Sequence, residues 1–160
     1  MLKPVKTKTA RASGGIFAII ASRYNAKFVD AMLRAASTEL RRAKAKVEIV
    51  RVPGAYEIPV VAAKLARASR ITHHASLSAI ICLGVIVRGE TVHAAHIGDS
   101  VSRALMQIQL ETGIPVIHEV LLLENVEQAR VRCLDRKHNR GTEAAQTALE
   151  MARVMKTLGG

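Results

Sequence analysis

The chain of 160 residues has few aromatic side chains: two Tyr, two Phe and no Trp. Its two cysteines form no C-x-x-C pair and no metal-like spacing with the histidines. No apolar run approaches the roughly 18 residues that a membrane-spanning helix needs. Structural zinc, a disulfide framework and a membrane partner are therefore excluded, and 49% hydrophobic residues exclude a disordered chain.

Acidic residues are scarce early in the chain, and the whole net charge of +11 arises within residues 1–70. Such a charge is typical of proteins that neutralise nucleic-acid phosphates. However, no aromatic side chain interleaves with a basic cluster to stack on bases. We therefore predict no specific nucleic-acid partner, and nucleic-acid binding stays a hypothesis that rests on charge alone.

The first 14 residues carry four cations, Lys3, Lys6, Lys8 and Arg11, and no acid. They lack the apolar stretch of a secretory signal. Their composition loosely resembles a transit peptide, but we interpret residues 1–14 as a basic tail. Because the chain is long enough for one core and too short for two, residues 15–160 are expected to form a single domain. The cytoplasm is the default location.

Strand-like and helix-like patterns alternate along that domain. Apolar runs predict strands at 16–21, 47–52, 77–87 and 116–123, and helical spacing predicts a helix after each of them. Asn25 is the expected N-cap of the first helix, Asn125 and Gln128 form an expected capping box, and 134–141 is an expected basic loop before a last helix.

This alternation predicts an α/β fold: a three-layer αβα sandwich around a doubly wound parallel sheet, as in flavodoxin-like proteins. Ligands of such folds bind outside the carboxyl ends of the strands. The informative segments are therefore the loops at 22–25, 53–57, 87–93, 118–124 and 132–141.

The common nucleotide-binding motifs of α/β folds, the Walker loop and G-x-G-x-x-G, are missing from those loops. Gly89-Glu90-Thr91 precedes a helix whose free N–H groups and dipole could receive a phosphate, although the loop alone better fits an ordinary helix start. His93 follows, and its side chain can move protons near neutral pH, although a lone histidine is more often structural. The residues alone therefore indicate an anion site and a candidate acid/base histidine.

Five segments, each in or beside one of these loops, together resemble the lumazine synthase family. They are Ser22–Asn25, Val52–Pro59, Gly84–His93, Glu127–Arg132 and Asn139–Ala145, and the resemblance runs from about Gly15 to Leu158. It implies a transferase of riboflavin biosynthesis that needs no cofactor or metal. The implied reaction, the penultimate step, condenses 5-amino-6-ribitylamino-pyrimidinedione with 3,4-dihydroxy-2-butanone 4-phosphate to give 6,7-dimethyl-8-ribityllumazine.

The resemblance also implies the site residues. His93 and Arg132 are the implied catalytic residues, with His93 as the acid/base group. The phosphate would be held by Gly89, Glu90 and Thr91, with Arg132 reaching in from a neighbouring subunit. The implied substrate-binding residues are Tyr24, Asn25, Ala55, Tyr56, Glu57, Val85, Ile86, Val87, His118 and Arg140.

Members of the family assemble as pentamers, some of which combine into decamers or sixty-subunit shells, so a homo-oligomer with shared sites is implied. Residues Val5–Lys8 would then add as an exchanged strand to a neighbour's sheet or stay solvated. Three departures stand out: His118 replaces an aromatic residue, Ala94-Ala95-His96 replaces an aromatic-rich stretch, and Arg140 replaces a lysine. The first two motivate an alternative, a pentameric or shell-forming assembly component with weak or lost catalysis.

Overall fold

The computed structural model describes residues 14–71 and 76–159, so the predicted tail or exchanged strand, including Val5–Lys8, lies outside the described residues apart from Gly14. Strands and helices alternate as expected. The elements are β1 (Ile16–Ser22), α1 (Ala26–Arg42), β2 (Lys46–Val52), the 3-10 turn η1 (Ala55–Glu57), α2 (Ile58–Ile71), β3 (Ala79–Val87), α3 (His93–Thr112), β4 (Val116–Leu123), α4 (Val126–Cys133) and α5 (Arg140–Leu158).

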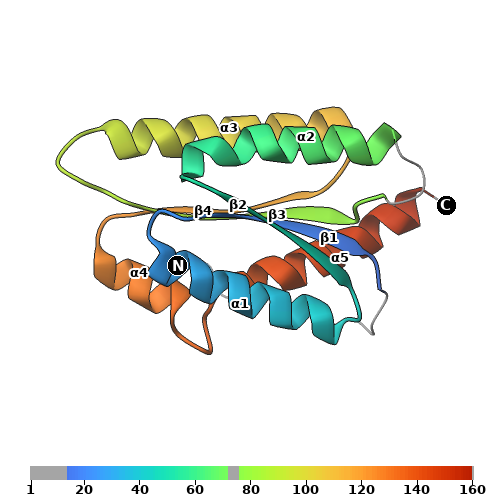
Figure 1. Ribbon diagram of the computed structural model, residues 1–160, viewed down its shortest axis with the longest axis horizontal. Helices are drawn as coiled ribbons and strands as arrows, with labels where there is room; N and C mark the ends of the chain where they lie inside the picture. Colours follow the sequence, from blue (N-terminus) through green and yellow to red (C-terminus); the bar gives the residue numbers. More distant parts are fainter. Residues whose placement is uncertain (1–13, 72–75, 160) are drawn as a thin grey trace.

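The four strands form one parallel sheet in the order β2-β1-β3-β4. Helices α2 and α3 cover one face of the sheet, and α1, α4 and α5 cover the other (Figure 1). The predicted αβα sandwich is confirmed, and the strand order is that of flavodoxin-like doubly wound sheets. All four carboxyl ends therefore lie at the same edge of the sheet, on the left in Figure 1.

The core has two halves, one on each face of the sheet. Residues 79–85 of the central strand β3 are all buried, because helices cover both faces of this strand. In β1, Phe17 and Ile19 pack with α1 and α5, whereas Ala18 and Ile20 pack with α2 and α3. The continuous apolar runs of the sequence thus mark strands that are buried on both sides.

Strand β4 lies at one edge of the sheet and places neighbouring residues on opposite faces. Val116 and Val120 belong to the core under α2 and α3, while Ile117 and Leu123 belong to the core under α1, α4 and α5. Because side chains alternate along a strand, His118 faces the α3 layer and Glu119 the α5 layer. This alternation fixes the surroundings of both residues.

Three local predictions need correction. Asn25 lies at the N-cap of α1, but its side chain makes no capping bond. In the predicted capping box, Asn125 accepts the N–H of Gln128 as expected, but the Gln128 side chain accepts the N–H of Glu124 instead of that of Asn125. The expected loop at 134–141 ends at 139, because the Asn139 side chain accepts the N–H of Gly141 and starts α5 at Arg140.

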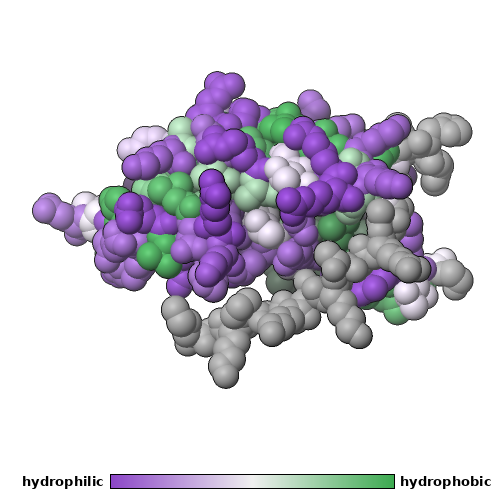
Figure 2. Space-filling view, turned by 90° about the horizontal axis from the view of Figure 1, so that it is seen from below, coloured by the Kyte–Doolittle hydropathy of each residue, from purple (hydrophilic) through white to green (hydrophobic). Residues whose placement is uncertain are grey.

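Hydrophilic residues cover most of the face that Figure 2 shows, which is the α1, α4 and α5 side of the molecule. Only small hydrophobic patches interrupt them on this face. In the part of the chain that the structure describes, no helix has both the length and the apolar character needed to cross a membrane.

Candidate active site

The loop that follows β1 is joined by hydrogen bonds to the end of β2, to the loop that follows β2 and to the end of β3. The Arg23 N–H donates to the carbonyl oxygen of Val52 at 2.8 Å, and the Tyr24 N–H donates to that of Pro53 at 3.0 Å. The Asn25 amide donates to the carbonyl oxygen of Val85 at 2.7 Å. The predicted residues of these segments therefore gather at the carboxyl edge of the sheet.

Asn25 has a left-handed backbone, with φ at 57°. Side chains other than glycine rarely adopt this conformation, although asparagine tolerates it better than most. Here the geometry turns the side-chain amide toward the end of β3 and away from the first turn of α1. A rare conformation of this kind tends to occur at functional sites, which fits the predicted role of Asn25 in substrate binding.

Two tyrosines lie beside this junction with their rings largely in solvent. Tyr24 is 74% exposed and Tyr56 is 64% exposed, whereas Ala55 between the loops is buried. The Glu57 carboxylate accepts the N–H of Gly54 at 2.9 Å, so Glu57 holds its own loop in shape. In a chain with so few aromatic residues, two exposed rings at one edge form an available stacking surface.

The predicted phosphate loop lies between β3 and α3, fully on the surface. Gly89, Glu90 and Thr91 are exposed, and the Thr91 hydroxyl lies 3.4 Å from the backbone nitrogen of His93, the first residue of α3. The loop is tied down by Arg88, whose N–H donates to Leu123 and whose guanidinium pairs with Glu124 at 3.1 Å. A helix start in solvent, next to an exposed histidine, can accept an anion and move a proton to or from it.

We call these residues of the first three loops, together with the end of β3, the carboxyl-edge group. Its members are Tyr24, Asn25, Ala55, Tyr56, Glu57, Val85, Ile86, Val87, Gly89, Glu90, Thr91 and His93. Val85 is buried, and Ile86 and Val87 are half-buried at the end of β3. Gly89 has no packing constraint of its own, because a Cβ there would have no neighbour within 4 Å.

The other three predicted residues, His118, Arg132 and Arg140, lie around the edge strand β4, and we call them the β4-edge group. His118 is fixed at both ring nitrogens: Nδ1 accepts the Val120 N–H at 3.1 Å, and Nε2 lies 2.7 Å from the Ser102 hydroxyl. Because Nδ1 accepts, the neutral ring carries its proton on Nε2 and donates to Ser102, which in turn donates to Gly98. Burial lowers the pKa of His118 below 6.5, which keeps the ring neutral at pH 7.

Arg140 is held by two carboxylates. Its Nε and Nη2 donate to the two oxygens of Glu119 at 3.0 and 2.7 Å, and its Nη1 donates to Glu143 at 2.5 Å. The Glu119 side chain is only 7% exposed. Burial raises the pKa of Glu119, and the hydrogen bond and charge of Arg140 oppose that rise.

Arg132 lies on the exposed side of α4, near the same cluster, and its positive charge acts to lower the pKa of both Glu119 and Cys133. Within residues 14–71 and 76–159, Arg132 takes part in no ion pair. It is therefore available to an external anion, in contrast with Arg140.

The carboxyl-edge group gathers at one edge of the sheet, but the β4-edge group is divided between the two faces of β4. His118 contacts α3, whereas Arg132 and Arg140 lie in the layer of α4 and α5. Among the residues described, no side-chain hydrogen bond or ion pair joins a member of the β4-edge group to a member of the carboxyl-edge group. Among the described residues, the two groups are therefore not linked by direct side-chain bonds.

Two residues that contact the β4-edge group were not identified from the sequence. Glu119 is an acidic residue in a strand that is apolar apart from it and His118, and this acidic residue was the available signal. Ser102 gave none, because its contact with His118 depends on how α3 packs against β4. Over the described ranges, no cluster of three or more His, Cys, Asp or Glu side chains could hold a metal ion.

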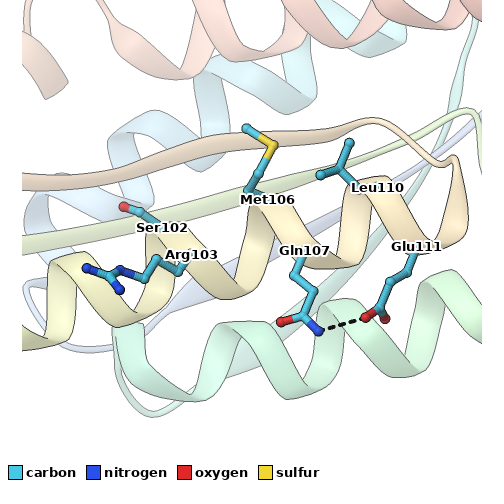
Figure 3. Close-up of a pocket in the computed structure, with 6 residues that line it drawn as sticks. All are labelled: Ser102, Arg103, Met106, Gln107, Leu110 and Glu111. Carbon is cyan, nitrogen blue, oxygen red and sulfur yellow. Dashed lines mark hydrogen bonds between the residues drawn. The ribbon is translucent and has the colours of Figure 1, made fainter.

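Ser102 also lines an open hollow of about 640 Å³ on the outer side of α3 (Figure 3). The other lining residues come from the same helix: Arg103, Met106, Gln107, Leu110 and Glu111. Gln107 donates to Glu111 at 2.7 Å, and the apolar side chains of Met106 and Leu110 are 54% and 76% exposed. The hollow lies apart from the carboxyl-edge group and adjoins the β4-edge group through Ser102 and His118.

Comparison with known proteins gives a consistent result over nearly the whole domain. A family model described as 6,7-dimethyl-8-ribityllumazine synthase matches residues 15–156. A protein of that name from Stenotrophomonas maltophilia strain K279a is 42% identical over 145 residues, covering 89% of this chain and 90% of the relative. Another, from Xanthomonas oryzae pv. oryzae strain PXO99A, is 41% identical with the same coverage. The chain belongs to the 6,7-dimethyl-8-ribityllumazine synthase family.

Proposed function

We propose that this protein condenses 5-amino-6-ribitylamino-pyrimidinedione with 3,4-dihydroxy-2-butanone 4-phosphate to give 6,7-dimethyl-8-ribityllumazine. Family membership supports the reaction, and one observation carries its location. This observation is the gathering of exposed Tyr24, left-handed Asn25 and the exposed Gly89–His93 loop at one edge of the sheet. Neither the structure nor the relatives favour the alternative of an assembly component without catalysis.

In this proposal the pyrimidinedione stacks on the exposed ring of Tyr24, and Asn25 and η1 surround its ribityl chain. Only one amide hydrogen of Asn25 needs to reach Val85, so the amide oxygen is free to accept a hydrogen bond from the substrate. Val85, Ile86 and Val87, the last residues of β3, lie beneath the pyrimidinedione ring.

The phosphate of the second substrate binds at the start of α3, against the loop formed by Gly89, Glu90 and Thr91. His93, the first residue of the helix, lies next to this loop and therefore close to the bound phosphate. After the substrate amine and ketone have lost water to form an imine, His93 can donate a proton to the leaving phosphate. The ribitylamino nitrogen then attacks the remaining carbonyl and closes the ring with loss of a second water. Most of the rate enhancement comes from holding the two substrates in register, because the substrates form the new C–N bonds between themselves and the protein needs to supply only proton transfers.

We also propose that the active form is a pentamer or a multiple of pentamers in the cytoplasm, in which the β4-edge group of one subunit completes the carboxyl-edge group of its neighbour. The absence of side-chain bonds between the two groups, within the described residues, supports this arrangement. Apolar side chains on α2 and α3 support it as well, since Val60, Ile71 and Leu110 are each at least 70% exposed and gathered on the same layer. Arg132 would then bind the phosphate across the interface.

The direct test incubates the purified protein with both substrates and follows the fluorescence of the lumazine product. We expect turnover above the uncatalysed background, and His93→Ala should lower it by roughly 10²-fold or less. Native mass spectrometry of the same sample should show masses that are multiples of five chains. Product formation at the background rate would refute the proposed reaction.

A further inference from the structure

The buried carboxylate of Glu119 changes what Arg140 can do in a binding site. A guanidinium has five N–H donors, and three of those of Arg140 are used by Glu119 and Glu143. Two donors remain for a ligand. The two carboxylates together outweigh the single positive charge, so the cluster as a whole is not a cationic site.

An anionic ligand therefore gains little from Arg140, whereas a neutral polyhydroxyl or carbonyl group can still accept its two free donors. Arg132, which lies nearby and has no ion-pair partner in the described part of the chain, provides the attraction for a phosphate. The two arginines of the β4-edge group thus differ in the ligand chemistry that they suit.

We propose, on the basis of the proposed function, that Glu119 is a positioning residue for the pyrimidinedione substrate. Its two hydrogen bonds fix the guanidinium of Arg140 and direct the remaining donors toward the uncharged ribityl and pyrimidinedione groups. The two parallel bonds from Nε and Nη2 to the Glu119 oxygens form a fork that holds the planar guanidinium in one orientation. Because the Glu119 side chain is only 7% exposed, few other conformations are open to either side chain. A lysine at position 140 could not form this pair of bonds, because its ammonium group lacks the planar fork of donors.

The test measures the affinity of the pyrimidinedione alone by titration calorimetry, and the KM of each substrate in the synthase assay. In Glu119→Gln, one acceptor oxygen becomes an amide that cannot accept, so the fork is lost. We expect pyrimidinedione binding to weaken by about tenfold or more, with the KM of the butanone phosphate changing by less than about threefold. Glu143→Gln, which leaves the fork in place, should cause a smaller loss.

Two further variants keep the result interpretable. Arg140→Lys retains the charge that Glu119 needs, and it should weaken pyrimidinedione binding by a similar factor without unfolding the protein, as thermal denaturation would report. Glu150→Gln on the same helix removes an exposed carboxylate that pairs only with Arg153 among the described residues, and it should match the wild type.

Equal losses for both substrates, equal effects of Glu119→Gln and Glu143→Gln, or unchanged binding in Arg140→Lys would each overturn the positioning role. These outcomes differ from failure of the proposed function, in which the unmodified protein itself would neither bind the pyrimidinedione nor form product.

Discussion

At the scale of single residues, Gly141 shows how closely α5 packs on α1. A Cβ at this position would lie 2.0 Å from the carbonyl oxygen of Met32, which belongs to the backbone of α1 and cannot move aside alone. We expect Gly141→Ala to destabilise the fold by about 3 kcal/mol or more, because one helix must shift away from the other. Urea denaturation at pH 7 measures this loss.

Gly98→Ala is the matched control, because it also adds one methyl group inside a helix. There a Cβ would make ordinary contacts with Leu122 at 3.5 Å. Since alanine favours a helix over glycine, this variant should be neutral or more stable by up to about 1 kcal/mol. Equal stability of the two variants would contradict the close approach of α1 and α5.

His118 gives a prediction about pH. Its pKa is lowered by burial from the ordinary value of 6.5, so between the two values the unfolded chain binds a proton that the folded chain does not. The contribution of His118 to stability is therefore complete above about pH 6.5 and is lost as the pH falls below it. In thermal denaturation between pH 5 and 7.5, the melting temperature of His118→Gln should fall less toward acid pH than that of the wild type. Identical pH profiles would contradict a partly desolvated ring that stays neutral in the folded state.

At the scale of elements, the strands were predicted well because burial on both faces leaves a plain signal: an unbroken apolar run such as Ile80–Leu83 is typical of a central strand covered by helices. The start of α1 was harder. Asparagine at a helix start usually caps it, but the Asn25 amide is engaged by the Val85 carbonyl, 60 residues away in the chain. Local preference cannot reveal a contact that depends on the folded sheet.

Helix α4 is short and depends on its cap. The Asn125 side chain accepts the N–H of Gln128 at 2.9 Å, and this eight-residue helix carries Arg132. We expect Asn125→Ala to cost about 1 kcal/mol of stability, whereas Asn125→Asp should retain it, because a carboxylate also accepts the bond and suits the helix dipole. Urea denaturation of both variants is the measurement. Equal losses would show that the cap does not stabilise α4.

At the scale of the whole molecule, the sequence was sufficient for the fold, for the family and for the loops that meet at the carboxyl edge of the sheet. It was not sufficient for the Glu119–Arg140 pair or the Ser102–His118 contact, because both depend on side chains of different elements meeting at the edge of the sheet. Among the described residues, no hydrogen bond or ion pair joins Arg132 to His93, and we propose that they meet across a subunit interface. This meeting is the central claim of the proposed mechanism, and it concerns two subunits.

The most direct test of this claim mixes two defective variants, Arg132→Ala and His93→Ala, by unfolding and refolding them together. Each variant alone should have low synthase activity. If neighbouring subunits share the site, about one quarter of the interfaces in an equal random mixture combine an intact carboxyl-edge group with an intact β4-edge group. We therefore expect activity in the mixture to rise to roughly a quarter of the wild-type value. Activity that stays at the average of the two separate variants would contradict a site shared between subunits.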